Sequence, residues 1–266
     1  MTSKNKLCVI IPARNEEQAV GETLDGLMKQ SFKPCKIIVV DDGSTDRTAD
    51  IAKQYNVQLI QLPDRGFEAV GKPALASVIN AGLKNAKDMD YICILGAEHQ
   101  LPPNYFQEII DRMETNHNLV IASGAIQGER SSPDFPWGSG RIIKARFFHE
   151  IGFQFPVEYG WEDWIVYKAK QLGFETRCFS DIVSKTKRPM SFRNKGEIMY
   201  ALGYDWKYAL GRCLRTLMRN PKTGLNMLKG WLFHKGVKRL DDVADWVNQY
   251  QKKIFWQKAK NLLGGF

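Results

Sequence analysis

Two acidic clusters, about 120 positions apart, have residue types and spacing suited to catalysis. Asp41-Asp42-Gly-Ser-Thr-Asp46 follows an apolar run, and Gly160-Trp-Glu-Asp163 opens a predicted helix. One carboxylate suffices to cap a helix. A second carboxylate of the first cluster can therefore accept a hydrogen bond from a nucleobase N–H or a ribose hydroxyl. An acid of the second cluster, set in a cleft, can take a proton from an attacking hydroxyl. Together the clusters predict nucleotide binding and general-base chemistry.

The elements that must position these acids alternate between strand and helix. Apolar, β-branched runs predict buried strands over residues 7–11, 36–40, 57–62 and 91–95, and helical spacing covers residues 16–30, 46–55 and 71–86. This rhythm predicts an α/β fold with an open, mostly parallel sheet. Ligands of such sheets bind outside the carboxyl ends of the strands, and all four strands here end in polar residues.

The rest of the chain divides at about residue 190. Residues 119–122 and 175–179 read as further strands, and residues 160–172 as a helix. Beyond residue 190 only helical patterns remain, including an amphipathic one from Leu202 to Leu217. We therefore expect a domain over residues 1–189 and a basic helical region over residues 190–266.

Several classes of protein are excluded by what the sequence lacks. Neither a G-x-G-x-x-G turn after the first strand nor a G-x-x-x-x-G-K loop is present, so dinucleotide and P-loop chemistry are not expected. The five cysteines are scattered without a C-x-x-C pair, which is typical of buried thiols in a reducing compartment. No apolar run approaches the roughly 20 residues of a membrane span, and no signal peptide is recognisable, so we expect a cytoplasmic protein.

The order of five motifs resembles that of family 2 glycosyltransferases over about residues 6–190. The motifs are residues 9–17 (VIIPARNEE), 38–46 (IVVDDGSTD), 71–83, 95–105 (LGAEHQLPPNY) and 160–163 (GWED). The resemblance implies a GT-A fold, a nucleoside-diphosphate-sugar donor and inversion at the anomeric carbon. It also implies that the first motif and the Asp-Asp turn hold the nucleotide, through Pro12, Arg14, Glu16, Asp41 and Asp42. Ala13 stands where some relatives place an aromatic residue against the base.

The same resemblance implies that Asp163 is the catalytic base and that Glu162 contacts the acceptor. The acceptor would be a hydroxyl or a lipid phosphate, as in the assembly of glycans or lipid-linked saccharides. Two other functions stay open. One is a glycosyltransferase-like binding or scaffold subunit, and the other is a sugar-phosphate nucleotidyltransferase, although the Gly-rich loop typical of the latter is missing.

The sequence departs from the family where the diphosphate must be held. Relatives usually carry Asp-x-Asp at the fourth strand end, whereas this chain has Gly96-Ala97-Glu98. A weakened Mg²⁺ or Mn²⁺ site at Glu98 is one reading, because Mg²⁺ keeps waters and relies on substrate phosphates. Direct neutralisation by the cations of residues 185–188 is another, and loss of donor binding is a third. The basic side chains considered for phosphate or sugar contacts are Arg65, Lys72, Lys185, Lys187 and Arg188.

The positive charge of the chain is concentrated at its end. Residues 187–266 contain 17 Lys and Arg against 5 Asp and Glu, while the preceding residues are slightly acidic. No nucleic-acid-binding motif is present, so nucleic acid is not expected as a partner. A solvated helical cap and an anionic membrane surface remain, and basic amphipathic helices with aromatic residues favour the second. The aromatic residues that would anchor it, or else pack in a core, are Trp206, Trp231, Phe233, Phe255 and Trp256.

Overall fold

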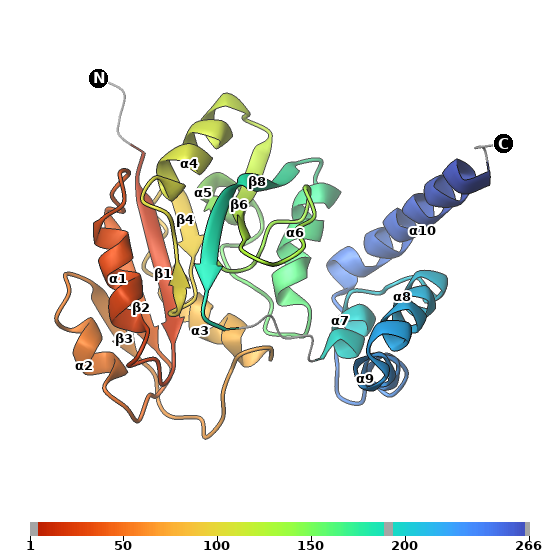
Figure 1. The fold of residues 1–266 in the computed structure, drawn as a ribbon, viewed down its shortest axis with the longest axis horizontal. Helices are drawn as coiled ribbons and strands as arrows, with labels where there is room; N and C mark the ends of the chain where they lie inside the picture. The colour runs from red at the N-terminus through yellow and green to blue at the C-terminus, as the bar shows by residue number, and fades with distance from the viewer. Residues whose placement is uncertain (1–4, 189–193, 264–266) are drawn as a thin grey trace.

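A mixed sheet with strand order β3-β2-β1-β4-β7-β6-β8-β5 runs through the computed structural model, which describes residues 5–188 and 194–263 (Figure 1). The strands are β1 (Leu7–Ala13), β2 (Lys36–Asp41), β3 (Gln58–Gln61), β4 (Tyr91–Ile94), β5 (His99–Gln100), β6 (Leu119–Ile126), β7 (Arg141–Lys144) and β8 (Glu175–Thr186). Strands β3, β2, β1 and β4 are mutually parallel, as predicted, and β7 joins them antiparallel to β4.

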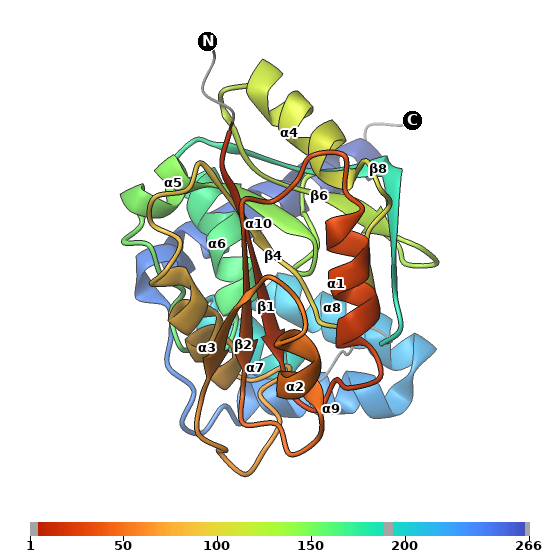
Figure 2. The ribbon, with the colours of Figure 1, turned by 90° about the vertical axis from the view of Figure 1, so that its left-hand side faces the viewer.

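Helices cover both faces of the parallel part, which explains its uninterrupted apolar strands. Along β1, Leu7, Val9 and Ile11 pack into one buried cluster, while Cys8 and Ile10 pack into the other. The helices of the α/β part are α1 (Val20–Met28), α2 (Thr48–Ala52), α3 (Ala74–Leu83), α4 (Tyr105–Thr115), α5 (Ala145–Glu150) and α6 (Trp161–Gln171). Figure 2 shows α1 and α3 on opposite sides of β1 and β2.

The second half of the sheet departs most from expectation. Strand β8 continues to Thr186, well beyond the predicted end at residue 179, because it follows β6 past a shift in register between Gly124 and Ala125. Its last residues then pair with the short strand β5. Strand β7 and helix α5 were not predicted. The extension of β8 brings residues 184–188 to the ends of β1 and β4.

The C-terminal region consists, where described, of α7 (Lys195–Ala201), α8 (Trp206–Arg219), α9 (Pro221–Leu232) and α10 (Asp241–Leu263). The helix predicted from Leu202 starts instead at Trp206, because the Asp205 carboxylate caps it by accepting the backbone N–H of Lys207 at 3.1 Å. Within residues 5–188 and 194–263, no helix is both long and apolar enough to cross a bilayer.

The C-terminal helices pack against α6 and share its buried apolar cluster. Trp164 Nε1 on α6 donates to the Asp242 carboxylate at 3.0 Å, and Lys168 Nζ lies 3.2 Å from the same group. The predicted boundary at residues 189 and 190 lies outside the described residues, so the division into two domains stays a prediction.

Candidate active site

A cavity of about 250 Å³ opens where β1, β2 and β4 end, at the edge of the sheet predicted for ligands. Its floor is apolar and comes from α3, β4 and Trp161 at the start of α6. The lining residues that carry polar chemistry or lie in the predicted motifs are Pro12, Ala13, Arg14, Glu16, Asp42, Glu68, Gly96, Glu98, His99, Ser139, Glu162 and Arg188. The cavity thus brings together residues from both ends of the predicted catalytic domain.

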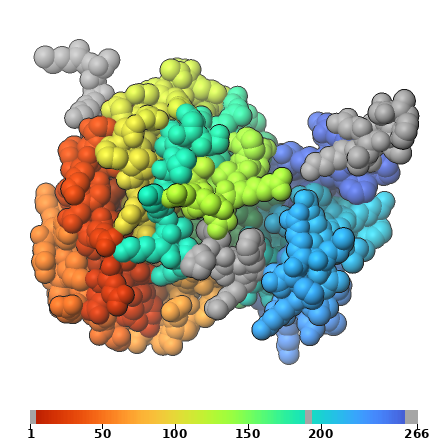
Figure 3. Space-filling model, in the orientation of Figure 1, coloured from red at the N-terminus to blue at the C-terminus, as the bar shows by residue number. Residues whose placement is uncertain are grey.

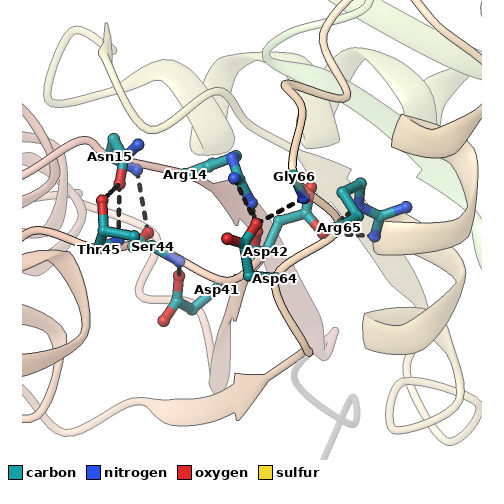
Figure 4. A network of polar contacts seen from close by, with 9 residues as sticks. All are labelled: Arg14, Asn15, Asp41, Asp42, Ser44, Thr45, Asp64, Arg65 and Gly66. Atoms are coloured by element: carbon teal, nitrogen blue, oxygen red, sulfur yellow. Dashed lines mark hydrogen bonds and ion pairs between the residues drawn. The ribbon is translucent and has the colours of Figure 1, made fainter.

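The two acids at the end of β2 have different partners (Figure 4). Asp41 Oδ1 accepts the backbone N–H of Ser44 at 2.9 Å, so this carboxylate closes the turn. Asp42 lines the cavity, and its Oδ1 accepts Arg65 Nε at 2.8 Å. Asp42 Oδ2 is buried and accepts no hydrogen bond from any described residue. Since a buried carboxylate oxygen without a partner is costly, Asp42 is poised to accept one from a ligand.

The segment after β1 is held beside Asp42 by its own polar contacts. Arg14 donates through Nη1 to the Asp42 carbonyl and through Nη2 to Asp64 at 2.6 Å. The hydrogen bond to Asp64 raises the pKa of Arg14, so this side chain stays cationic. Asn15, in the left-handed region at φ 53°, donates its backbone N–H to Ser44 Oγ at 3.0 Å. These bonds fix one cation at the mouth of the cavity.

Four of the side chains predicted to bind the donor lie off the cavity lining. Asp41 closes its turn, and Arg65 reaches the site only through Asp42. Lys72 lies beside the cavity, but its Nζ is 4.4 Å above the ring of Phe67. Lys187 Nζ pairs instead with Glu22 on α1 at 2.7 Å, because β8 ends beside that helix.

Glu16, Glu98 and Arg188 meet at one end of the cavity. Arg188 forms an ion pair with Glu16, and its Nε lies 4.0 Å from Glu98 Oε1. Burial raises the pKa of Glu16, and Arg188 opposes that rise. A Cβ on Gly96 would lie 3.1 Å from Glu98 Oε2, so Glu98 fills the space of the missing first carboxylate.

Glu16 is already ion-paired with Arg188, which leaves the Glu98 carboxylate as the candidate ligand for a divalent ion at this place. Within the described residues, no three His, Cys, Asp or Glu side chains gather as a metal-binding group. Glu98 alone fits an ion such as Mg²⁺, which takes its other ligands from water and substrate phosphates. Arg188, one of the cations considered in place of a metal ion, lies beside Glu98. Its guanidinium can bind a diphosphate through two parallel N–H hydrogen bonds.

His99, although it lines the cavity, is committed to a buried hydrogen-bond chain. Ser184 Oγ donates to the Ala125 carbonyl at 3.0 Å, so it must accept from His99 Nε2 at 2.8 Å. His99 Nδ1 then accepts from Ser139 Oγ at 2.5 Å, and that oxygen accepts the Gly96 N–H. Burial lowers the pKa of His99 to about 4. This histidine is therefore a neutral support for the loop at residue 96.

Glu162 projects from the first turn of α6 into the cavity. Helix α6 begins after Gly160, which adopts φ 84°, a conformation that favours glycine. The Glu162 carboxylate packs so closely on Gly138 that a Cβ there would lie 1.7 Å from Oε1. Burial raises the pKa of Glu162, and the guanidinium of Arg141 opposes that rise.

Asp163, one position further along α6, does not line the cavity. Burial and then the charge of Asp163 raise the pKa of Tyr204 to about 12, and Tyr204 in turn lies 3.1 Å from the hydroxyl of Tyr167. The charge of Asp163 also acts on Arg212 of α8. The same charge acts on the guanidinium of Arg141, so Asp163 influences groups on the cavity side as well as groups of the C-terminal region.

Arg141 is a site residue that the sequence analysis missed. It is 3% exposed and donates to three backbone carbonyls, those of Pro136, Trp137 and Glu162, at 2.7–3.0 Å. It therefore ties the loop before β7 to the start of α6. The one signal for it is an arginine directly after Gly138-Ser139-Gly140, which does not by itself indicate burial.

Comparison with known proteins places this geometry in a family. A model of glycosyl transferase family 2 matches residues 8–161. The 4,4'-diaponeurosporenoate glycosyltransferase of Staphylococcus aureus is 43% identical over 58 residues, which cover 22% of this chain and 15% of that protein. The matched segment is thus a small part of this curated relative.

Two solved structures share the fold at low sequence identity. TarS of S. aureus, in complex with UDP, is 18% identical with a TM-score of 0.58, covering 85% of this chain and 71% of that one. The mannosyltransferase PcManGT of Pyrobaculum calidifontis, in complex with GDP-Man and Mn²⁺, is 18% identical with a TM-score of 0.59, covering 88% and 71%. The predicted GT-A architecture is confirmed, and the chain belongs to glycosyl transferase family 2.

Proposed function

We propose that this glycosyltransferase moves a sugar from a nucleoside-diphosphate donor, with inversion, to a hydroxyl or a lipid phosphate in the assembly of a glycan or lipid-linked saccharide. The observation that carries the proposal is Asp42 Oδ2, a buried acceptor without a partner among the described residues, in a cavity that also contains Glu162. The complexes of TarS with UDP, a nucleoside diphosphate, and of PcManGT with GDP-Man, a nucleoside-diphosphate sugar, support a donor of this class.

In this proposal the nucleoside and the diphosphate of the donor bind at opposite ends of the cavity. Asp42 accepts a hydrogen bond from the nucleoside, and Arg14 holds the segment that faces it. The diphosphate lies toward Glu98 and Arg188, where positive charge must stabilise the leaving group. A divalent ion held by Glu98 would supply such charge when bound, and Arg188 supplies it from the chain itself.

An inverting transfer also needs a base on the face of the sugar opposite the diphosphate, since the transition state is oxocarbenium-like. We assign this role to Asp163, whose charge acts on Tyr204, between α7 and α8, and on Arg212 of α8, and we place the acceptor on that side. Glu162, which faces the cavity, then contacts the acceptor or the transferred sugar.

Calorimetry with UDP, GDP and dTDP, each with Mn²⁺ and with EDTA, tests donor binding. Asp42→Asn should weaken nucleotide affinity at least tenfold, whereas Asp50→Asn, at an exposed ion pair on α2, should leave it unchanged. Loss of Mn²⁺ dependence in Glu98→Gln would assign the ion to Glu98. Strong binding in EDTA that Arg188→Gln abolishes would assign the charge to Arg188. No binding of any nucleotide would contradict the proposal and favour the scaffold alternative.

Transfer assays with the variants of α6 separate the two acids. Asp163→Asn should keep donor affinity and lose at least a hundredfold in turnover, because a general base contributes about 10² to 10⁴. Glu162→Gln should retain more activity than Asp163→Asn. The reverse order would make Glu162 the base, and near wild-type turnover in both variants would exclude base catalysis by this motif.

A further inference from the structure

Helix α8 carries a line of apolar side chains that are exposed to solvent. Trp206, Leu210, Leu214 and Met218 recur every four residues, which places them along one side of the helix. Three of them are more than half exposed, at 59% for Trp206, 51% for Leu214 and 87% for Met218. Buried Ala209 and Cys213 already provide the contact of this helix with the core, so the line of exposed residues is not needed for folding.

The end of α10 extends this apolar line with two more aromatic residues. Phe255 and Trp256, 39% and 57% exposed, border the same small cavity as Trp206. The Nζ atom of Lys207 lies 5.5 Å from the ring of Trp206 and 5.7 Å from that of Trp256. We call the surface made by Trp206, Leu210, Leu214, Met218, Phe255 and Trp256 the docking face.

Basic side chains accompany the docking face. Lys207, Arg215 and Arg219 lie on α8 beside the apolar line, and within residues 5–188 and 194–263 none of them forms an ion pair. These cations belong to the segment that holds 17 Lys and Arg against 5 Asp and Glu. Figure 3 shows the helices that carry them as a lobe beside the α/β part.

We propose that the docking face binds the surface of an anionic lipid bilayer. Tryptophan and phenylalanine with lysine at their rims suit the boundary between acyl chains and headgroups, and leucine and methionine suit the depth just below it. Each unpaired cation then strengthens partitioning onto an anionic surface by about fivefold. An uncharged protein partner would leave the excess of cations without a role.

The docking face and the proposed base meet different sides of α8. The charge of Asp163 acts on Arg212, which lies two positions from both Leu210 and Leu214 and therefore on the other side of the helix. Binding to a bilayer does not require the proposed sugar donor. It is therefore measured in the absence of any nucleotide sugar, and its outcome does not depend on the proposed function.

Flotation of the full chain with vesicles tests the docking face. Vesicles of phosphatidylcholine with 30% phosphatidylglycerol, chosen as the probe at about the charge of an anionic bilayer, should bind the chain at least tenfold more than phosphatidylcholine alone. Leu214→Glu with Met218→Glu should lower this partitioning at least tenfold. Val157→Glu with Leu172→Glu, two exposed apolar positions outside the C-terminal helices, should change it less than twofold.

The charge contribution has its own test, Lys207→Gln with Arg215→Gln, which should reduce binding to anionic vesicles and leave binding to neutral ones unchanged. Equal partitioning of the wild-type chain onto both vesicles would overturn the proposal, as would equal losses in the two double-Glu variants. A dimer in solution that Leu214→Glu with Met218→Glu dissociates, without vesicle binding, would make the docking face an interface between copies instead.

Discussion

Lowering the pH should destabilise the folded chain through His99. This side chain is 1% exposed, and burial lowers its pKa from the ordinary 6.5 to about 4. Since the unfolded chain then binds the proton more tightly, the contribution is fully present above pH 6.5 and is lost as the pH falls toward 4. Between pH 7.5 and 4.5 the two pKa values correspond to a loss of about 2 to 3 kcal/mol in the free energy of unfolding.

Urea unfolding at these two pH values, in wild type and in His99→Gln, isolates this contribution from that of the carboxylates. We expect His99→Gln to lower stability at pH 7.5, because Ser139 and Ser184 lose a matched partner, and to show a fall on acidification that is about 2 to 3 kcal/mol smaller than in wild type. His117→Gln, at an exposed position, should behave as wild type. Equal falls in wild type and His99→Gln would refute the assignment of a buried neutral imidazole.

Two further substitutions test the packing of the site and of the C-terminal region. Gly138→Ala should displace the Glu162 carboxylate, because the new Cβ would lie 1.7 Å from Oε1, and should lower transfer at least tenfold while Gly26→Ala, with no atom within 4 Å, leaves it unchanged. Asp205→Ala should cost about 1 kcal/mol in urea unfolding through loss of the α8 cap, and Asp205→Asn should recover most of it.

The parallel part of the fold could be predicted because its signals are local. Strands β1, β2 and β4 are short, mainly apolar runs that are followed by polar residues, and this pattern needs no knowledge of distant partners. Strand β8 was predicted too short because residues 180–186 contain no continuous apolar run and include Asp181 and Lys185. What extends it is pairing with β6 and β5, which are more than 50 residues away in the sequence.

Side-chain partnerships at the site were harder to predict, since they join segments far apart in the chain. His99 is oriented by Ser139 and Ser184, 40 and 85 positions away. Arg188 reaches Glu16 across 172 positions. The residue types at these places are ordinary, and only the folded chain determines which of them meet.

In each acidic pair, Asp41 with Asp42 and Glu162 with Asp163, only one side chain lines the cavity, and backbone geometry explains why. Successive side chains of a strand point to opposite faces, so Asp41 and Asp42 at the end of β2 cannot both enter one cavity. Adjacent positions of a helix differ by about 100°, so Glu162 and Asp163 also diverge. In the first pair, Asp41 closes a turn. In the second pair, the charge of Asp163 acts on Tyr204 and Arg212. The C-terminal helices are therefore part of the environment of the proposed base, so changes in α8 that leave the donor cavity intact should still alter turnover.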